Sequence, residues 1–262
     1  MSQGNVAVTT PTIADQGRRR WVIPLVACLA VFAFPAILDG APVTGGALTD
    51  LIPAVLFDPL AESVPALLPI AKLLLLGVAV AGLLGVRHHA RIILGYYAAI
   101  LVVIALTQNA ADLGDRGFAL ITGNAVGQLI VATMAFIGLR SATDNSTLRR
   151  GRLWVTPLMA LAWLYPFVLD DGVVRPGLDV FNGAGVTYCM VTPVIAGLLF
   201  LRPDGCARTT GLAVGALGVV FGLLNLTTWW IAHPENWWMG VLHVPLFVVS
   251  LALAVTSARR AR

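Results

Sequence analysis

Lys72 is the only lysine of the chain, and it lies within an apolar run, residues 64–86, that is long enough to cross a membrane as a helix. An amine near the middle of a bilayer costs about 3 kcal/mol, so such residues have a partner, a water-filled cavity or a route to the surface. The ammonium group could bind an anionic ligand, pair with a carboxylate (Asp39, Asp170 or Asp171), or extend along its alkyl stem to the outer interface. Lys72 is therefore the first candidate ligand-binding residue.

Two aspartates lie at corresponding outer ends of predicted helices. Asp39 follows Pro35 by one turn, and Asp170 follows Pro166 in the same way. Because proline frees backbone carbonyls of the helix, each position could offer oxygen atoms to a proton, a cation or water. The alternative is a solvated helix end, since a carboxylate at the interface costs little. Both aspartates are candidate binding residues.

Polar side chains within other apolar runs complete the candidate set. Asn124 and Gln128 are four residues apart and share one face of a helix, so they are expected to face protein or a cavity rather than lipid. Asn225 lies deep in a later run. These amides either form hydrogen bonds between helices or line a polar path. His243 is the side chain best placed to titrate near neutral pH, although a neutral, hydrogen-bonded imidazole is the simpler interpretation.

The chain lacks the motifs of common enzyme classes and of metal sites. It contains no H-E-x-x-H, no G-x-S-x-G and no phosphate-binding P-loop. Its three cysteines, Cys28, Cys189 and Cys206, have no spacing with histidine that indicates zinc or haem attachment. We therefore expect no metal and no cofactor, and we assign no catalytic residue. Intramembrane catalysis on a lipid or quinone stays open as a third functional hypothesis.

Composition indicates a membrane protein. Of the 262 residues, 58% are hydrophobic and 11% are charged, which is far from the balance of a soluble domain. The basic residues occur in short clusters between apolar runs, where they act as topology signals, so a nucleic-acid partner is not expected. Membrane lipids are the expected surroundings, and we predict a multi-pass protein of a prokaryotic plasma membrane.

The apolar runs predict an all-α integral membrane protein with eight transmembrane helices, at residues 21–38, 64–86, 92–108, 117–139, 153–169, 184–201, 211–232 and 239–256. The proline-rich segment between the first two is expected to lie along the outer interface. Most of the 17 basic residues fall in the connections of one face, and most of the 13 acidic residues fall in those of the other. The basic bias predicts that both termini are cytoplasmic.

Similar landmarks recur in the two halves of the chain. Residues 20–40 and 153–172 both contain W-V-x-P-L, followed by an aromatic residue and P-x-x-L-D. This order predicts a tandem four-plus-four repeat whose halves enter the membrane in the same direction, with the binding site between them. The predicted divisions are a flexible cytoplasmic tail (1–17), a first four-helix repeat (18–139), a basic cytoplasmic connector (140–152) and a second four-helix repeat (153–262).

These features predict a protein that handles a small solute or lipid-like molecule in a bundle cavity near Lys72, by transport or permeation. The ligand would be anionic or amphipathic. The alternative is an accessory or scaffold subunit of a larger membrane complex, or a homo-oligomer, because the connections are short and glycines form stripes in the second and seventh runs. The first hypothesis requires a polar cavity, whereas the second requires a closed bundle with exposed glycine grooves.

Overall fold

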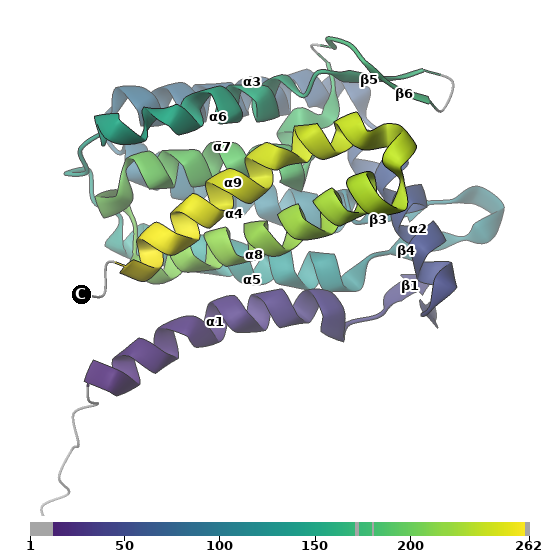
Figure 1. Ribbon diagram of the computed structural model, residues 1–262, viewed down its shortest axis with the longest axis horizontal. Coiled ribbons are helices and arrows are strands. Elements are labelled where there is room, and N and C mark those ends of the chain that lie inside the picture. The colour runs from purple at the N-terminus through teal and green to yellow at the C-terminus, as the bar shows by residue number, and fades with distance from the viewer. Residues whose placement is uncertain (1–12, 171–172, 180, 260–262) are drawn as a thin grey trace, which may run out of the picture.

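The computed structural model describes residues 13–170, 173–179 and 181–259, and most of the predicted N-terminal tail lies outside these residues. The described chain is mainly helical (Figure 1). Its α-helices are α1 (Ile13–Ala33), α2 (Gly46–Phe57), α3 (Leu68–Leu84), α4 (His89–Thr107), α5 (Thr122–Gly138), α6 (Thr156–Leu164), α7 (Tyr188–Leu201), α8 (Arg208–Thr227) and α9 (Trp237–Arg259). Short 3-10 segments include η1 (Leu60–Glu62), η5 (Arg150–Val155) and η6 (Gly183–Val186).

Five helical segments are long and apolar enough to cross a membrane, and they contain α3, α4, α5, α8 and α9. Two shorter apolar segments are Trp21–Ala33 of α1 and Tyr188–Leu201 of α7. The long helices run along the longest axis of the molecule, whereas α2 lies across one end (Figure 1). The structure therefore supports the predicted class, a helical membrane protein.

Two of the predicted spans end earlier than expected because proline stops the helix. α1 ends at Ala33 and α6 ends at Leu164, and Pro35 and Pro166 follow two residues later. The residue before a proline avoids the helical region, and proline itself has no N–H to continue the helix. After each proline the chain continues as a strand. Hydrophobicity alone did not reveal this change, since short buried strands and helical segments have similar composition.

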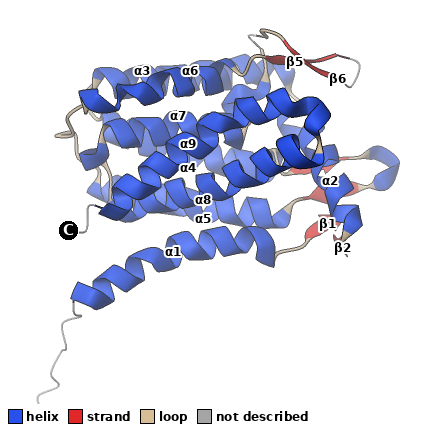
Figure 2. Ribbon diagram, viewed as in Figure 1, coloured by secondary structure: helices blue, strands red, loops and turns tan. Residues whose placement is uncertain are grey.

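The connections at one end of the bundle form two small antiparallel sheets, and Figure 2 shows their strands gathered there. The first contains β1 (Ala36–Leu38), β2 (Ala41–Val43), β3 (Ala110–Asp112) and β4 (Phe118–Leu120), in the order β2-β1-β4-β3. The second is a hairpin of β5 (Phe167–Asp170) and β6 (Val173–Pro176). The all-α prediction missed these strands. Leu51 and Val55 of α2 are buried in a small core with the first sheet, so α2 occupies the place of the predicted interfacial segment.

α7 forms the centre of the main core, because every residue of this helix is buried. α8 and α9 approach each other closely where glycine leaves room: a Cβ at Gly215 would lie 2.7 Å from the backbone nitrogen of Ala254. The glycines of α8 thus serve packing within the chain. Gly77 of α3 differs, since a Cβ there would meet nothing within 4 Å.

Candidate functional site

A cavity of about 250 Å³ lies between α2 and the bundle, where residues in or next to α4, α5, α7, α8 and α9 line it. Buried side chains, among them Asn109, Gln128 and His243, line its inner part. Exposed side chains, Phe57 and Leu224, line its outer part. The cavity therefore leads from the interior of the bundle to the surface beside α2.

Four residues selected from the sequence line this cavity together: Asn124, Gln128, Asn225 and His243. They come from α5, α8 and α9, so helices distant in the chain bring them to one place. The lining also includes polar residues that the sequence analysis did not select as binding candidates: Glu62, Gln108, Asn109 and Cys189. Glu62 was placed in the interfacial segment, and Gln108 at the end of a predicted span.

Hydrogen bonds fix the orientation of the Asn109 and Gln128 amides. Asn109 Nδ2 donates to the carbonyl of Ala105 at 3.3 Å and to Gln128 Oε1 at 2.7 Å. The amide nitrogen of Asn109 must face that carbonyl, and its position in turn determines which atom Gln128 presents. Within the described part of the chain, Asn109 Oδ1 and Gln128 Nε2 have no partner. One acceptor and one donor are therefore left for a bound molecule.

Asn225 and Gln108 are fixed by backbone groups in the same way. Asn225 Nδ2 donates to the carbonyl of Phe221 at 2.9 Å, and Gln108 Oε1 accepts from the N–H of Tyr188 at 2.8 Å. The bonds leave Asn225 Oδ1 as an acceptor and Gln108 Nε2 as a donor. The amides thus present both kinds of hydrogen-bonding group to a ligand.

His243 is buried in α9, and its Nδ1 lies 2.7 Å from the carbonyl oxygen of Met239. A carbonyl only accepts, so the proton of the neutral imidazole is on Nδ1 and Nε2 is an acceptor. No residue in the described ranges bonds Nε2. His243 therefore adds a third acceptor to those of Asn109 and Asn225.

Trp229 and Asn124 are further residues of the cavity wall with a polar group that lacks a protein partner among the described residues. Trp229 Nε1 is buried without an acceptor. Asn124 also lines the cavity, and its amide makes no hydrogen bond to the described chain. A buried donor without an acceptor costs about 1–3 kcal/mol. A ligand oxygen or a water molecule near Trp229 would remove this cost.

Lys72 lies behind the cavity wall and is not among the described residues that line it. It is 4% exposed, and its Nζ donates to the carbonyls of Leu164 and Asp179, both at 3.2 Å, and to Asn182 Oδ1 at 3.0 Å. Nζ also lies 5.1 Å from the ring centroid of Trp163. Protein oxygens hold the ammonium group, so it does not extend to the interface.

Asn182 connects Lys72 to the cavity wall. Its Nδ2 donates to the carbonyls of Leu164 at 3.1 Å and Tyr165 at 2.9 Å, and its Oδ1 also accepts from the N–H of Ala184 at 3.2 Å. Tyr165 lines the cavity with a positive φ of 46°, an uncommon conformation for a residue with a side chain. Asn182 therefore holds an unfavourable backbone conformation in place.

The two aspartates selected from the sequence lie in the hairpins at the sheet end. Asp39 occupies the exposed β1–β2 turn with a φ of 48°, and its N–H donates to the carbonyl of Phe118 at 2.8 Å. Asp170 ends β5, and its side chain lies outside the described part of the structure. Neither aspartate is among the described residues that line the cavity.

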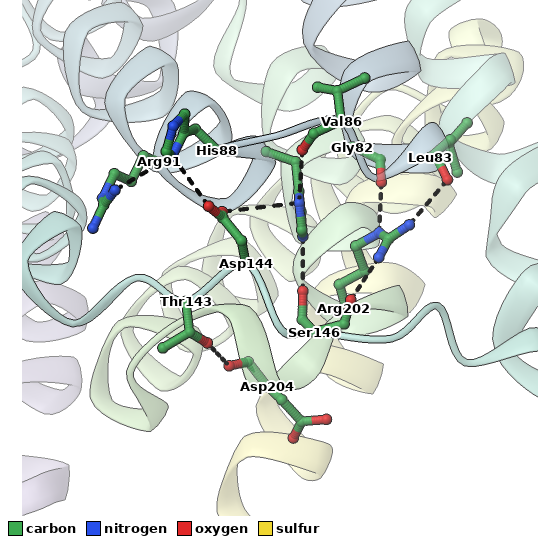
Figure 3. A network of polar contacts seen from close by, with 11 residues as sticks. Gly82, Leu83, Val86, His88, Arg91, Thr143, Asp144, Ser146, Arg202 and Asp204 are labelled. Carbon is green, nitrogen blue, oxygen red and sulfur yellow. Dashed lines mark hydrogen bonds and ion pairs between the residues drawn. The ribbon is translucent and has the colours of Figure 1, made fainter.

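A polar network joins the connections at the other end of the bundle (Figure 3). Arg202, after α7, donates to backbone carbonyls of α3 and, at 2.6 Å, to the carbonyl of Ser146 in the predicted basic connector. Ser146 Oγ lies 2.8 Å from His89 Nε2, and Thr143 Oγ1 donates to the carbonyl of Asp204 at 2.9 Å. The connector is therefore bonded to the α3–α4 and α7–α8 turns.

Within the described ranges, no group of three or more His, Cys, Asp or Glu side chains could hold a metal ion. Comparison of the chain with protein-family models, with curated proteins and with solved structures finds no match. The cavity is therefore the feature from which a function can be inferred.

Gly185→Ala is expected to destabilise the protein by about 2 kcal/mol, because a Cβ at Gly185 would overlap the backbone of Ala71 and Lys72. The overlap would push η6 away from α3, beside the Lys72–Asn182 contact. Thermal unfolding of the purified protein in detergent measures the effect. Gly77→Ala is the matched control, since open space surrounds Gly77. Equal melting temperatures of the two variants would show that η6 moves aside without cost.

Proposed function

We propose that this protein binds a small amphipathic molecule in the cavity beneath α2 and so handles a solute or lipid-like compound, by transport or permeation. The observation that carries the proposal is the set of cavity amides whose orientation is fixed by protein hydrogen bonds. Each of Gln108, Asn109, Gln128 and Asn225 keeps one polar atom for a ligand, as the bonds described above require. Aromatic and aliphatic side chains form the rest of the wall.

The composition of the wall favours an amphipathic ligand over a purely anionic one. Among the described residues that line the cavity, none is a lysine or an arginine, and Glu62 is a carboxylate. Lys72, the residue expected to attract an anion, already donates to three protein oxygens. An anion in the cavity would therefore lose its hydration without gaining a cationic partner.

We further propose that α1, α6 and α7 also cross the membrane, which gives eight spans and a parallel four-plus-four repeat. Two observations support this. The axes of α6 and α7 lie along the same long axis of the molecule as those of the longer helices (Figure 1). α1 and α6, which carry the repeated sequence landmarks, each end before a proline and lead into a hairpin, β1–β2 and β5–β6. The cavity then lies between the halves, because both contribute helices to it.

The same arrangement gives an orientation. In Figure 1 the first residues of α1 and the last residues of α9 lie at the end opposite the sheets. The start of α4 and the connector after α5 are at that end too, because α4 leads into β3 and α5 follows β4 at the sheet end. Figure 3 shows the polar contacts that join this connector to the turns carrying Arg91 and Arg202. By the basic bias this end is cytoplasmic, in a prokaryotic plasma membrane, and the cavity is near the outer side.

Cys189 provides a direct test, because it lines the cavity. In protein carrying Cys28→Ala and Cys206→Ala, methyl methanethiosulfonate is expected to modify Cys189 in the folded, lipid-embedded state. Benzyl alcohol, a small amphipathic probe, is expected to slow this modification several-fold by occupying the cavity. The readout is the mass of the intact protein over time.

In the control protein Cys28 is the single remaining cysteine, because Cys189→Ala and Cys206→Ala remove the other two. Cys28 is a partly exposed residue of α1 and is not among the described residues of the cavity wall, so benzyl alcohol should leave its modification rate unchanged. Modification of Cys189 only after denaturation, or equal slowing at both cysteines, would overturn the proposed binding function.

A further inference from the structure

Glu62 is an unpaired carboxylate at the outer part of the cavity. Its side chain lines the cavity and is exposed at the surface. Throughout the described residues, no lysine, arginine or histidine forms an ion pair with it, and no donor hydrogen-bonds it. Burial against the wall and, second, the negative charge of Asp58 raise the pKa of the Glu62 carboxyl above its ordinary value. A positive charge beside Glu62 would relieve both effects.

Aromatic rings stand in the same cavity wall as Glu62. Phe57 and Trp229 form an edge-to-face pair with ring centroids 6.0 Å apart. Tyr165 and Phe167 form a second such pair with centroids 4.2 Å apart. The faces of aromatic rings carry partial negative charge and attract organic cations, most strongly where water is excluded. A carboxylate together with aromatic rings is a combination suited to an ammonium group.

We propose that the ligand is an amphipathic organic cation, whose ammonium group meets Glu62 and the two aromatic pairs, Phe57–Trp229 and Tyr165–Phe167. This inference rests on the proposed function and names the ligand class of the same cavity. The apolar part of the ligand contacts the aliphatic and aromatic wall, and a polar substituent reaches the inner acceptors Asn225 Oδ1 and His243 Nε2.

The surroundings of the cavity are consistent with a cationic ligand. None of the described lining residues is a lysine or an arginine that would repel it, and the neutral imidazole of His243 offers an acceptor. The sheet end also carries acidic residues in its exposed turns, including Asp39 and Asp115, which raise the local concentration of cations. The ammonium group can belong to a free amine or to a lipid headgroup, and both present the same charge to Glu62.

Phenyltrimethylammonium and tert-butylbenzene form a matched probe pair, because they share shape and differ in charge. In lipid nanodiscs of phosphatidylglycerol alone, phenyltrimethylammonium is expected to slow the modification of Cys189 at concentrations at least about tenfold lower in wild type than in Glu62→Gln. The neutral tert-butylbenzene should protect wild type and Glu62→Gln equally. Glu235→Gln is the control, since Glu235 is an exposed carboxylate that contacts His233 and is not among the described residues that line the cavity.

The outcomes separate this inference from the proposed function. If neither probe protects Cys189, the binding function itself fails. If tert-butylbenzene protects and phenyltrimethylammonium does not, or if Glu62→Gln binds the cation as wild type does, the cation assignment alone is wrong. Adding phosphatidylethanolamine to the nanodiscs identifies the source of the ammonium group. If the lipid weakens phenyltrimethylammonium binding in wild type and not in Glu62→Gln, the natural ligand is a lipid headgroup. If binding is unchanged, the natural ligand is a free amine.

Discussion

Asn182→Leu is expected to destabilise the folded protein by about 3 kcal/mol, more than any other single substitution near the cavity. The change removes four hydrogen bonds that the Asn182 side chain makes, to Lys72, Leu164, Tyr165 and Ala184. It also leaves the Lys72 ammonium group buried with one acceptor fewer. Removing a partner from a buried charge costs more than removing the charge itself.

Lys72→Met removes the buried charge in place of its partner and is expected to lower the free energy of unfolding by less, about 1–2 kcal/mol. Methionine removes the buried charge, while Asn182 keeps its bonds to the carbonyls of Leu164 and Tyr165. The double variant should therefore be more stable than the sum of the single changes implies. Unfolding in mixed detergent micelles, followed by tryptophan fluorescence, measures the stability of the two single variants and of the double variant.

Asn236→Leu is the matched control for Asn182→Leu, because the Asn236 side chain makes no hydrogen bond to the described chain. If Asn182→Leu were no more destabilising than Asn236→Leu, the contact with Lys72 would have no structural role. A second measurement concerns the cavity. Because Asn182 bonds the carbonyl of Tyr165, its loss should also weaken the protection of Cys189 by benzyl alcohol, whereas Asn236→Leu should not.

The sequence was a better guide to the class of fold than to the ends of its elements. Length and apolarity predict helices correctly where no proline interrupts the run, as in α4 and in α3 after its first turn. The predicted helix ends are wrong at Pro35 and Pro166, where the hydrophobic run continues although the helix has ended. Strand pairing across long sequence separations, such as Ile37 with Leu120, leaves no local signal in composition.

The candidate site shows the same limit for side chains. Asn124, Gln128, Asn225 and His243 were selected because polar groups in apolar runs must face protein, and the structure brings them to one cavity. Lys72 was selected by the same argument, but it faces backbone carbonyls behind the wall. Burial cost predicts that a polar residue has a partner, and it does not predict which partner. That choice depends on how α3, α6 and η6 pack.

Arg202→Met is expected to destabilise the protein by about 2 kcal/mol, because it removes the cap of the partly buried last turn of α3. Arg202 Nε donates to the carbonyl of Gly82 at 2.6 Å, and its Nη2 donates to the carbonyl of Leu83 at 3.2 Å. These carbonyls belong to the last turn of α3, where no following helical N–H reaches them. The guanidinium also complements the negative end of the helix dipole.

The same substitution should loosen the basic connector, since Arg202 Nη1 donates to the carbonyl of Ser146 at 2.6 Å (Figure 3). Cleavage by trypsin at Arg149 and Arg150, in protein whose connector face is accessible to the protease, is expected to become faster in Arg202→Met. Arg140→Met is the control, because no hydrogen bond or ion pair joins the Arg140 side chain to the described chain. If Arg202→Met were as stable as Arg140→Met, water would cap α3 as well as Arg202 does. If trypsin cleaved both variants at the same rate, the connector would be held by its other contacts.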